Sequence, residues 1–204
     1  MPDSKSNIHT VFDRLIPNEA KEALLGQRGL VVWLYGMSGS GKSTLAVTLE
    51  RHFHEAGRLC QVLDGDNIRS GINKDLGFSD DDRRENIRRI AEIAKLFCGL
   101  NALTFASFIT PTNELRCSAR EIIGDAALLE VYVKASYEAC ETRDVKGLYA
   151  KAKAGKVQQF TGKDSAFEEP NAADVVIDTE TLTVEQAAEK LIALITPRLA
   201  TKLS

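Results

Sequence analysis

The chain has 204 residues, of which 44% are hydrophobic and 27% are charged, and its formal net charge is −3. These values predict one compact domain and exclude a chain that is disordered throughout. The small net charge excludes recruitment of nucleic acid by charge alone, so we expect a small-molecule partner. The apolar runs are shorter than the ~20 residues of a membrane span, and the polar N-terminus does not resemble a secretory signal, which favours the cytoplasm.

Short apolar segments alternate with segments of helical periodicity, which predicts a parallel α/β sheet covered by helices. Residues 1–29 precede this pattern and are expected to form a helical lead-in around residues 17–25. The remaining residues, 30–204, are expected to fold as one domain. Its strands are expected at 30–35, 59–63, 103–107, 128–133 and 175–177.

Two helices carry recognisable end signals. The helix expected over 43–56 is followed by Gly57, a residue suited to the left-handed conformation after a helix end. The last helix is expected to begin after Thr183, whose spacing to Gln186 is typical of a capping box, and to end at Pro197. Residues 144–170 contain no clean strand, and a segment of this length predicts a lid or a binding loop.

The four cysteines are scattered and form no C-x-x-C pair. This spacing argues against a zinc site, and the expected cytoplasmic location argues against disulfides. We therefore expect free thiols, most of them buried, at Cys60, Cys98, Cys117 and Cys140.

A glycine-rich turn, G-M-S-G-S-G-K-S, joins the first strand to the following helix. It matches the P-loop, a turn whose backbone N–H groups surround phosphates, both in sequence and in context. In such a turn Lys42 would contact the β- and γ-phosphates and Ser43 would hold Mg²⁺. The nearest strings to a GTPase base-reading motif, at Asn73 and Thr161, do not fit it, so ATP is favoured over GTP. The predicted ATP-binding residues are Gly36, Met37, Ser38, Gly39, Ser40, Gly41, Lys42, Ser43 and Thr44.

The second predicted strand ends in Asp64-Gly65-Asp66, at the sheet edge where open α/β sheets bind ligands. One carboxylate could order magnesium through water, and the other could accept a proton from an attacking hydroxyl group. We assign the base to Asp66 and the supporting metal contact to Asp64. The alternative is that either carboxylate only caps the helix that follows.

The helix that begins near Asp82 has an apolar face, and helical periodicity directs Arg83 toward its middle, with Asn86 close by. An inward arginine needs an anion or a carboxylate, because a buried unpaired charge is costly. Its neighbours Arg84, Arg88 and Arg89 are expected on a solvated face, where Arg88 would pair with Glu92.

Together, Arg69, Phe78, Arg83 and Asn86 offer two guanidinium groups, an amide and a ring, a set suited to an anionic nucleotide. For Phe78 the alternative is a hydrophobic staple at the start of a helix. In the lid, Arg143 and Lys146 are predicted to reach the site, Arg143 on the ATP side. A solvated basic loop is expected at Lys151, Lys153 and Lys156.

Several motifs are more specific than the P-loop: L-D-G-D-N-I-R, D-L-G-F-S, the D-R-x-E-N-I-R-R run, F-I-T-P, R-D-V-K-G-L-Y-x-K-A-K-A-G and F-T-G-K-D-S. In these motifs, over residues 7–178, the chain resembles the adenylylsulfate kinases, which transfer the γ-phosphate of ATP to the 3′-hydroxyl of adenosine 5′-phosphosulfate. The resemblance implies a P-loop NTPase fold, a three-layer α/β sandwich with a mostly parallel five-stranded sheet and a lid.

The resemblance also implies a homodimer, a role in sulfate activation, and contacts of the acceptor nucleotide with named residues. A sulfurylase is a further candidate partner. The implied acceptor contacts are Asp66, Arg69, Phe78, Arg83, Asn86, Ile109, Thr110, Lys146 and Phe160.

This chain departs from the family pattern at Thr110, where the family usually has serine, and at Asn113, since no arginine follows until Arg116. The serine has been proposed in the family as a phosphorylated intermediate, which makes Thr110 a weak catalytic candidate. Direct transfer between two bound nucleotides needs no protein nucleophile. The alternatives to the predicted activity are a kinase of the same fold with another nucleotide-linked acceptor and a non-catalytic ATP-binding regulatory module.

Overall fold

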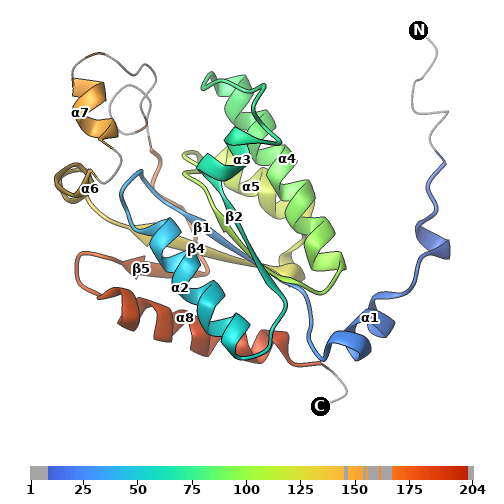
Figure 1. Ribbon diagram of the computed structural model, residues 1–204. Helices are drawn as coiled ribbons and strands as arrows, with labels where there is room; N and C mark the ends of the chain where they lie inside the picture. The colour runs from blue at the N-terminus through green and yellow to red at the C-terminus, as the bar shows by residue number, and fades with distance from the viewer. Residues whose placement is uncertain (1–8, 145–146, 154, 156–160, 162–166, 202–204) are drawn as a thin grey trace, which may run out of the picture.

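The computed structural model describes residues 9–144, 147–153, 155, 161 and 167–201. Its core is a sheet of five strands in the order β2-β3-β1-β4-β5, and all four strand pairings are parallel (Figure 1). The predicted sheet is confirmed, each strand to within one residue at either end. The strands are β1 (Leu30–Tyr35), β2 (Cys60–Asp64), β3 (Leu103–Ser107), β4 (Leu128–Lys134) and β5 (Val175–Asp178).

Helices connect the strands. Two short 3-10 helices are also present: η2 (Phe12–Arg14) precedes α1, and η3 (Asp125–Ala127) precedes β4. The residues of β1 are apolar throughout and buried on both faces of the sheet, as expected for a central parallel strand. The α-helices are α1 (Asn18–Leu25), α2 (Lys42–Glu55), α3 (Gly65–Ser70), α4 (Asp80–Gly99), α5 (Asn113–Ile123), α6 (Tyr137–Arg143), α7 (Leu148–Lys153) and α8 (Val184–Leu199).

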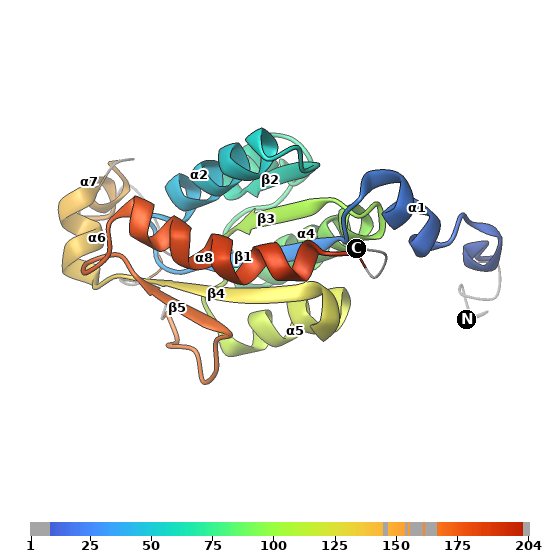
Figure 2. The ribbon, with the colours of Figure 1, turned by 90° about the horizontal axis from the view of Figure 1, so that it is seen from below.

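The domain has three layers (Figure 2). Helices α2 and α8 cover one face of the sheet, where Leu49 and Leu191 pack against alternate strand residues such as Val32. Helices α4 and α5 cover the other face, where Ile90 packs on the side that holds Trp33. Both faces are therefore apolar, and the polar carboxyl ends of the strands are left at one edge of the sheet.

The helix-end signals predicted two boundaries correctly and one wrongly. Gly57 follows the end of α2 in the left-handed conformation, with φ of +74°, as predicted. The capping box of Thr183 and Gln186 also begins α8, but Pro197 lies inside this helix, which continues to Leu199. Proline removes one helical hydrogen bond, yet the last turn persists because Leu199 is buried and its carbonyl oxygen accepts the N–H of Arg28 at 3.0 Å.

The N-terminal lead-in forms helix α1, as predicted, and α1 contains no buried residue. It is joined to the domain by Gln27, whose side-chain amide bonds both backbone groups of Leu59, and by the Asn101 side chain, which donates to Asn18. Residues 9–17, which precede α1, extend away from the sheet (Figure 1).

The four cysteines are free thiols, as predicted, but the expectation that most are buried is wrong. Only Cys140 is buried among them, because α6 carries it against the phosphate loop, whereas Cys117 lies on the exposed side of α5. Within the described ranges, no helix is long and apolar enough to cross a membrane.

Candidate active site

A cavity of about 700 Å³ opens at the carboxyl ends of the strands. This is the edge at which parallel α/β sheets bind ligands, and the volume is in the range of nucleotide and cofactor sites. One end of the cavity is formed by the phosphate loop and the turn into α8, and the other end by the start of α4. The turns after β2 and β3 form the wall between these ends.

The phosphate loop, residues 36–43, depends for its shape on glycines at positions where a side chain would clash or strain the backbone. A Cβ atom on Gly36 would lie 2.3 Å from the carbonyl oxygen of Val133, and Gly41 begins α2 with φ of +100°. The loop therefore leads backbone N–H groups and the N-terminus of α2 to the cavity, which is an arrangement that binds phosphate.

Lys42 is buried in the loop, and its Nζ donates to the carbonyl oxygens of Gly36 at 2.9 Å and Met37 at 2.7 Å. The same side chain lines the cavity. The Lys42 side chain therefore borders the space that the phosphates of a nucleotide would fill.

Oxygen atoms suited to a magnesium ion gather beside Lys42. The Ser43 hydroxyl donates to Oδ2 of Asp64 at 2.6 Å and lies 3.3 Å from the Ser107 hydroxyl. Asp64 also caps α3 by accepting the N–H of Asp66, so the alternative role as a helix cap is observed. The metal contact of Asp64 stays a prediction. Hard oxygen donors of this kind fit Mg²⁺.

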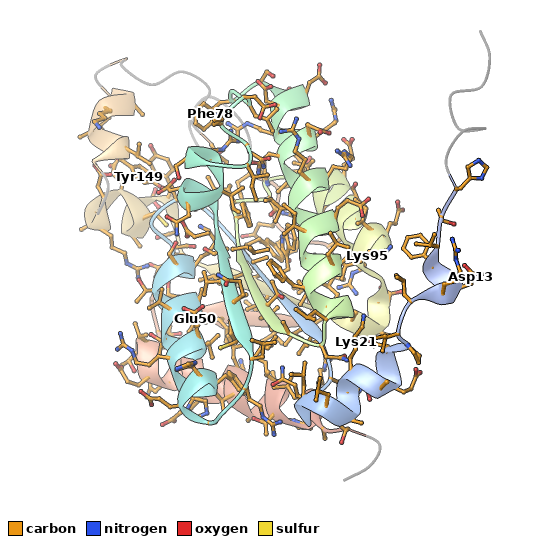
Figure 3. All side chains as sticks on the ribbon, turned by 45° about the vertical axis from the view of Figure 1, so that its right-hand side comes forward. Asp13, Lys21, Glu50, Phe78, Lys95 and Tyr149 are labelled. Atoms are coloured by element: carbon orange, nitrogen blue, oxygen red, sulfur yellow. The ribbon has the colours of Figure 1, made fainter. Side chains whose placement is uncertain are left out.

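The residues predicted for the acceptor line the opposite end of the cavity. The guanidinium carbon of Arg69 lies 4.5 Å from the centroid of the Phe78 ring, and this ring is 58% exposed (Figure 3). Phe78 is therefore not packed away as a hydrophobic staple. Arg83 donates to the carbonyl oxygen of Phe78 at 3.0 Å and to the hydroxyl of Thr161 at 2.8 Å, which connects α4 to the lid.

The charges at this end favour an anion. Burial lowers the pKa of the Arg69 guanidinium, and the positive charge of Arg83 lowers it further. Burial also lowers the pKa of Arg83. Each shift means that the charged form is less stable here than in water, so a bound phosphate or sulfate group would be attracted.

Asn86 is buried at the edge of the cavity and is oriented by a residue that the sequence analysis did not assign to the site. The side-chain amide of Asn73 donates to Oδ1 of Asn86 at 3.0 Å. This bond leaves the amide group of Asn86 as the donor toward the cavity. No periodicity marks Asn73, because it lies in the turn between α3 and α4.

Thr110 and Ile109, for which the resemblance implied contacts with the acceptor, both border the cavity. The hydroxyl of Thr110 is buried and accepts the indole N–H of Trp33 at 3.0 Å. Its backbone is left-handed, with φ of +42°, an uncommon conformation for a β-branched residue. The turn therefore holds the Thr110 hydroxyl against the core.

Asn113 and Arg116, where the chain departs from the family pattern, both form contacts that hold the turn after β3. Asn113 begins α5, and its backbone and side-chain N–H groups donate to the carboxylate of Glu168 at 2.7 and 3.1 Å. Arg116 is buried and donates to the carbonyl oxygens of Thr110 and Glu168, both at 2.8 Å. Neither side chain lines the cavity, so both connect the turn after β3 to residues 167–171.

Of the predicted lid residues, Arg143 borders the cavity and donates to the hydroxyl of Thr179 at 3.0 Å. Lys146 and Phe160 lie outside the described residues, as does Lys156. Lys151 and Lys153 are exposed to solvent, as predicted, but they lie on helix α7 and not in a loop. Lys153 forms an ion pair with Glu141 at 2.9 Å.

The outer face of α4 was predicted to be a solvated face with an Arg88–Glu92 pair, and the structure agrees only in part. Arg84 and Arg88 are exposed, but Arg88 pairs with Glu85 at 2.7 Å and not with Glu92. Arg89 is half-buried and binds both Glu85 and Asp75 at 2.8 Å. Glu85 lies within reach of both arginines because residues three and four apart share one helix face.

Two further parts of the cavity wall were not predicted from the sequence. Ser107 ends β3 directly beside Asp64, and its position as the last, polar residue of a predicted strand was the signal that could have identified it. The turn from β5 into α8 supplies a mostly apolar wall at the phosphate-loop end, where no motif marks it. Its residues are Thr179, Leu182, Thr183, Val184 and Ala187.

Comparisons with known proteins agree with this geometry. The family model described as adenylylsulphate kinase matches residues 28–178. The chain is 50% identical to an adenylyl-sulfate kinase of Bacteroides thetaiotaomicron over 98% of this chain and 100% of that protein. It is 53% identical to an adenylyl-sulfate kinase of Phocaeicola vulgatus over 95% of each chain.

Solved structures give the same result. The APS kinase of Mycobacterium tuberculosis, in complex with AMPPNP and APS, superimposes with a TM-score of 0.80 at 42% identity, covering 83% of this chain and 98% of that chain. The family model spans most of the chain, and both relatives are aligned almost from end to end. The chain therefore belongs to the adenylylsulfate kinase family.

Proposed function

We propose that this protein is an adenylylsulfate kinase that transfers the γ-phosphate of ATP to the 3′-hydroxyl of adenosine 5′-phosphosulfate. The observation that carries the proposal is a single cavity with a phosphate loop at one end and an arginine-lined anion site with an exposed ring at the other. Such a cavity suits two nucleotides whose reacting groups meet in its middle.

At the donor end, the loop N–H groups and Lys42 would bind the β- and γ-phosphates of ATP. Ser43 and Asp64 would hold Mg²⁺, directly and through water, and the ion would neutralise charge on the phosphates. The apolar turn into α8 would receive the adenine, and Arg143 would close this end.

At the acceptor end, Phe78 would stack on the adenine of adenosine 5′-phosphosulfate, and Arg69 and Arg83 would bind its phosphosulfate group. Asn86 and the turn with Ile109 and Thr110 would complete this pocket, together with Lys146 and Phe160. These contacts would present the 3′-hydroxyl to the γ-phosphate.

Asp66 is the base in this proposal. It lies in the first turn of α3 and borders the cavity between the two ends. Its carboxylate would accept or orient the proton of the 3′-hydroxyl while that oxygen attacks the γ-phosphorus and the bond to the β-phosphate oxygen breaks. Positioning and charge neutralisation then supply most of the rate, and no protein nucleophile is required.

The proposal is tested by chromatography of products formed from ATP, Mg²⁺ and adenosine 5′-phosphosulfate, beside a panel of other nucleotide acceptors. We expect 3′-phosphorylated product with this acceptor and little ADP without it. Preferred use of another acceptor would support the same-fold alternative. ATP binding with no transfer to any acceptor would support a regulatory module.

The resemblance also implies a homodimer, which we include in the proposal. Exposed apolar side chains near the N-terminus, including Phe12 and Ile16, are compatible with a protein partner. Sedimentation equilibrium of the purified protein tests this part, and a monomer at micromolar concentration would contradict it. Docking of a sulfurylase stays a prediction that co-sedimentation with that enzyme would test.

A further inference from the structure

Three consecutive carbonyl groups of the phosphate loop are each held by a side chain from outside the loop. The hydroxyl of Tyr149 donates to the carbonyl oxygen of Ser38 at 2.7 Å. Arg143 donates to that of Gly39 at 3.4 Å, and the hydroxyl of Thr179 donates to that of Ser40 at 3.0 Å. We call Tyr149, Arg143 and Thr179 the carbonyl clamp.

Holding a carbonyl group also fixes the N–H group of the next residue. A trans peptide is planar, and its C=O and N–H bonds point in opposite directions. The carbonyl group that Tyr149 holds therefore sets the direction of the Gly39 N–H, and Thr179 does the same for Gly41. Both glycines have positive φ and line the cavity, so these N–H groups belong to the surface that would meet phosphate.

The Tyr149 hydroxyl is itself placed rigidly. The residue is 2% exposed, and its ring packs edge-on against Tyr137 with centroids 5.2 Å apart. The carboxylate of Asp144 accepts the N–H groups of Tyr149 and Ala150, both at 3.0 Å, which fixes the first turn of α7. Burial raises the pKa of Tyr149, so its hydroxyl stays a donor at neutral pH.

Thr179 is held equally well. Its N–H donates to the carbonyl oxygen of Lys134 at 3.0 Å, and both of its oxygen atoms accept from Arg143, at 3.0 and 2.8 Å. Because Arg143 is a donor only, the single hydroxyl proton of Thr179 is available for a carbonyl oxygen. The oxygen of Ser40 is nearer, at 3.0 Å, than that of Lys134, at 3.2 Å.

We propose that Tyr149 and Thr179 are positioning residues for the phosphate donor, which keep the phosphate loop in its binding conformation by holding the Ser38 and Ser40 carbonyl groups. Both act on the phosphates through the loop; Thr179 also borders the cavity, whereas Tyr149 is not among the residues that line it. Tyr149 lies on α7 and Thr179 precedes α8, so the clamp joins the lid and the turn into α8 to the loop. This inference rests on the proposed ATP site.

The test is calorimetric titration of the full-length protein with a non-hydrolysable ATP analogue and Mg²⁺, and separately with adenosine 5′-phosphosulfate. Tyr149→Phe keeps the ring and removes the donor, and Thr179→Val keeps the shape and removes the hydroxyl. Loss of one hydrogen bond in the loop predicts about 3- to 10-fold weaker binding of the analogue in each variant. Affinity for adenosine 5′-phosphosulfate is expected to stay within about 2-fold of wild type.

Two matched variants separate positioning from packing. Tyr35→Phe removes another buried tyrosine hydroxyl, one that has no hydrogen-bond partner within the described part of the chain, and should leave both affinities unchanged. Thr179→Ser keeps the hydroxyl and should restore the affinity lost in Thr179→Val.

Unchanged binding of the analogue in Tyr149→Phe and Thr179→Val would overturn the inference. Equal weakening of both ligands would also overturn it, because it would indicate general loosening. Since the readout is binding, the clamp is tested even if transfer to adenosine 5′-phosphosulfate fails. A wild-type protein that did not bind the analogue would refute the ATP site and the clamp together.

Discussion

At the scale of single residues, Asp66 has the most specific proposed role. Its carboxylate borders the cavity, whereas its neighbour Asp64 is engaged by Ser43 and by the cap of α3. We predict that Asp66→Asn leaves the dissociation constant for ATP nearly unchanged and lowers turnover at least ~100-fold, because the amide cannot accept the hydroxyl proton. Steady-state kinetics and ATP titration check this, and turnover near wild type would remove Asp66 from the mechanism.

Arg83 provides the test of the anion site. Arg83 is half-buried, lines the cavity and donates to Thr161. Arg83→Ala should therefore weaken the binding of adenosine 5′-phosphosulfate at least ~10-fold and the binding of ATP much less. The control is Arg84→Ala on the same helix, since Arg84 is exposed and paired with Asp81 and Glu114. Calorimetry that found equal weakening of both ligands in Arg83→Ala would contradict the assignment.

The candidate site residues that could be predicted from the sequence are those whose type and spacing are set by chemistry. The glycines, Lys42 and Ser43 follow from the needs of a phosphate-binding turn, and the inward direction of Arg83 follows from helical periodicity. Asn73 and Thr179 could not be predicted in this way, because they lie in turns and act through contacts 13 and 139 residues away in the chain.

At the scale of elements, α4 serves two environments at once. Its inner face packs on the sheet and supplies Arg83 and Asn86, and its outer face carries the ion pairs of Glu85. Arg89 links the outer face to the site, because it binds Glu85 and Asp75 and one of its guanidinium nitrogens lies 3.5 Å from Oδ1 of Asn73. The ion pairs on the outer face therefore support the residue that orients Asn86.

These ion pairs predict a dependence of stability on pH. Hydrogen bonds from Arg88 and Arg89 lower the pKa of Glu85 from 4.5 to about 2. A lowered carboxyl pKa stabilises the folded state above about pH 5, and this contribution is lost as the pH falls toward 2. Because the pairs are partly exposed and screened, Glu85→Gln should cost below ~1 kcal/mol at pH 7.

Urea denaturation of wild type and Glu85→Gln at several pH values measures this effect. The difference between their free energies of unfolding should shrink between pH 5 and pH 2. A difference that is constant over this range would exclude the ion pairs as its source. Glu92→Gln is the control on the same helix, since Glu92 is exposed.

The elements themselves were predictable because their signals are local. Continuous apolar runs such as 30–35 predict central strands, and the Thr183–Gln186 spacing predicts the start of α8. The end of α8 was predicted wrongly because the burial of Leu199 and its bond from Arg28 are long-range contacts that outweigh the preference of Pro197. The Arg88 pairing was wrong because Glu85 competes for the same guanidinium group.

At the scale of the whole molecule, the carboxyl ends of the strands form the candidate site, and the opposite edge of the sheet contributes to stability. The carboxyl edge holds the cavity, and the opposite edge is held together by the buried amides of Gln27 and Asn101. Gln27 bonds both backbone groups of Leu59 and the carbonyl oxygen of Asn101, at 2.7 to 3.0 Å. These bonds fasten the segment after α1 to the domain.

We predict that Gln27→Ala lowers the free energy of unfolding by ~2–3 kcal/mol, because buried backbone groups lose their partners. The Michaelis constants should stay within about 2-fold of wild type, since the change lies far from the cavity. Gln61→Ala, at an exposed glutamine of β2, should be nearly neutral. A large rise in either Michaelis constant, or no loss of stability, would contradict the claim that this edge contributes to stability and not to substrate binding.

The central claim is that the phosphoryl group passes directly between two nucleotides held in one cavity. A single-turnover, rapid-quench experiment with γ-labelled ATP and adenosine 5′-phosphosulfate tests it most directly, with Thr110→Val measured alongside. We expect the label to move into the 3′-phosphate of the product with none on the protein, because the Thr110 hydroxyl is buried against Trp33. A labelled protein that forms and decays at the rate of product formation, or a Thr110→Val variant without transfer, would contradict the account.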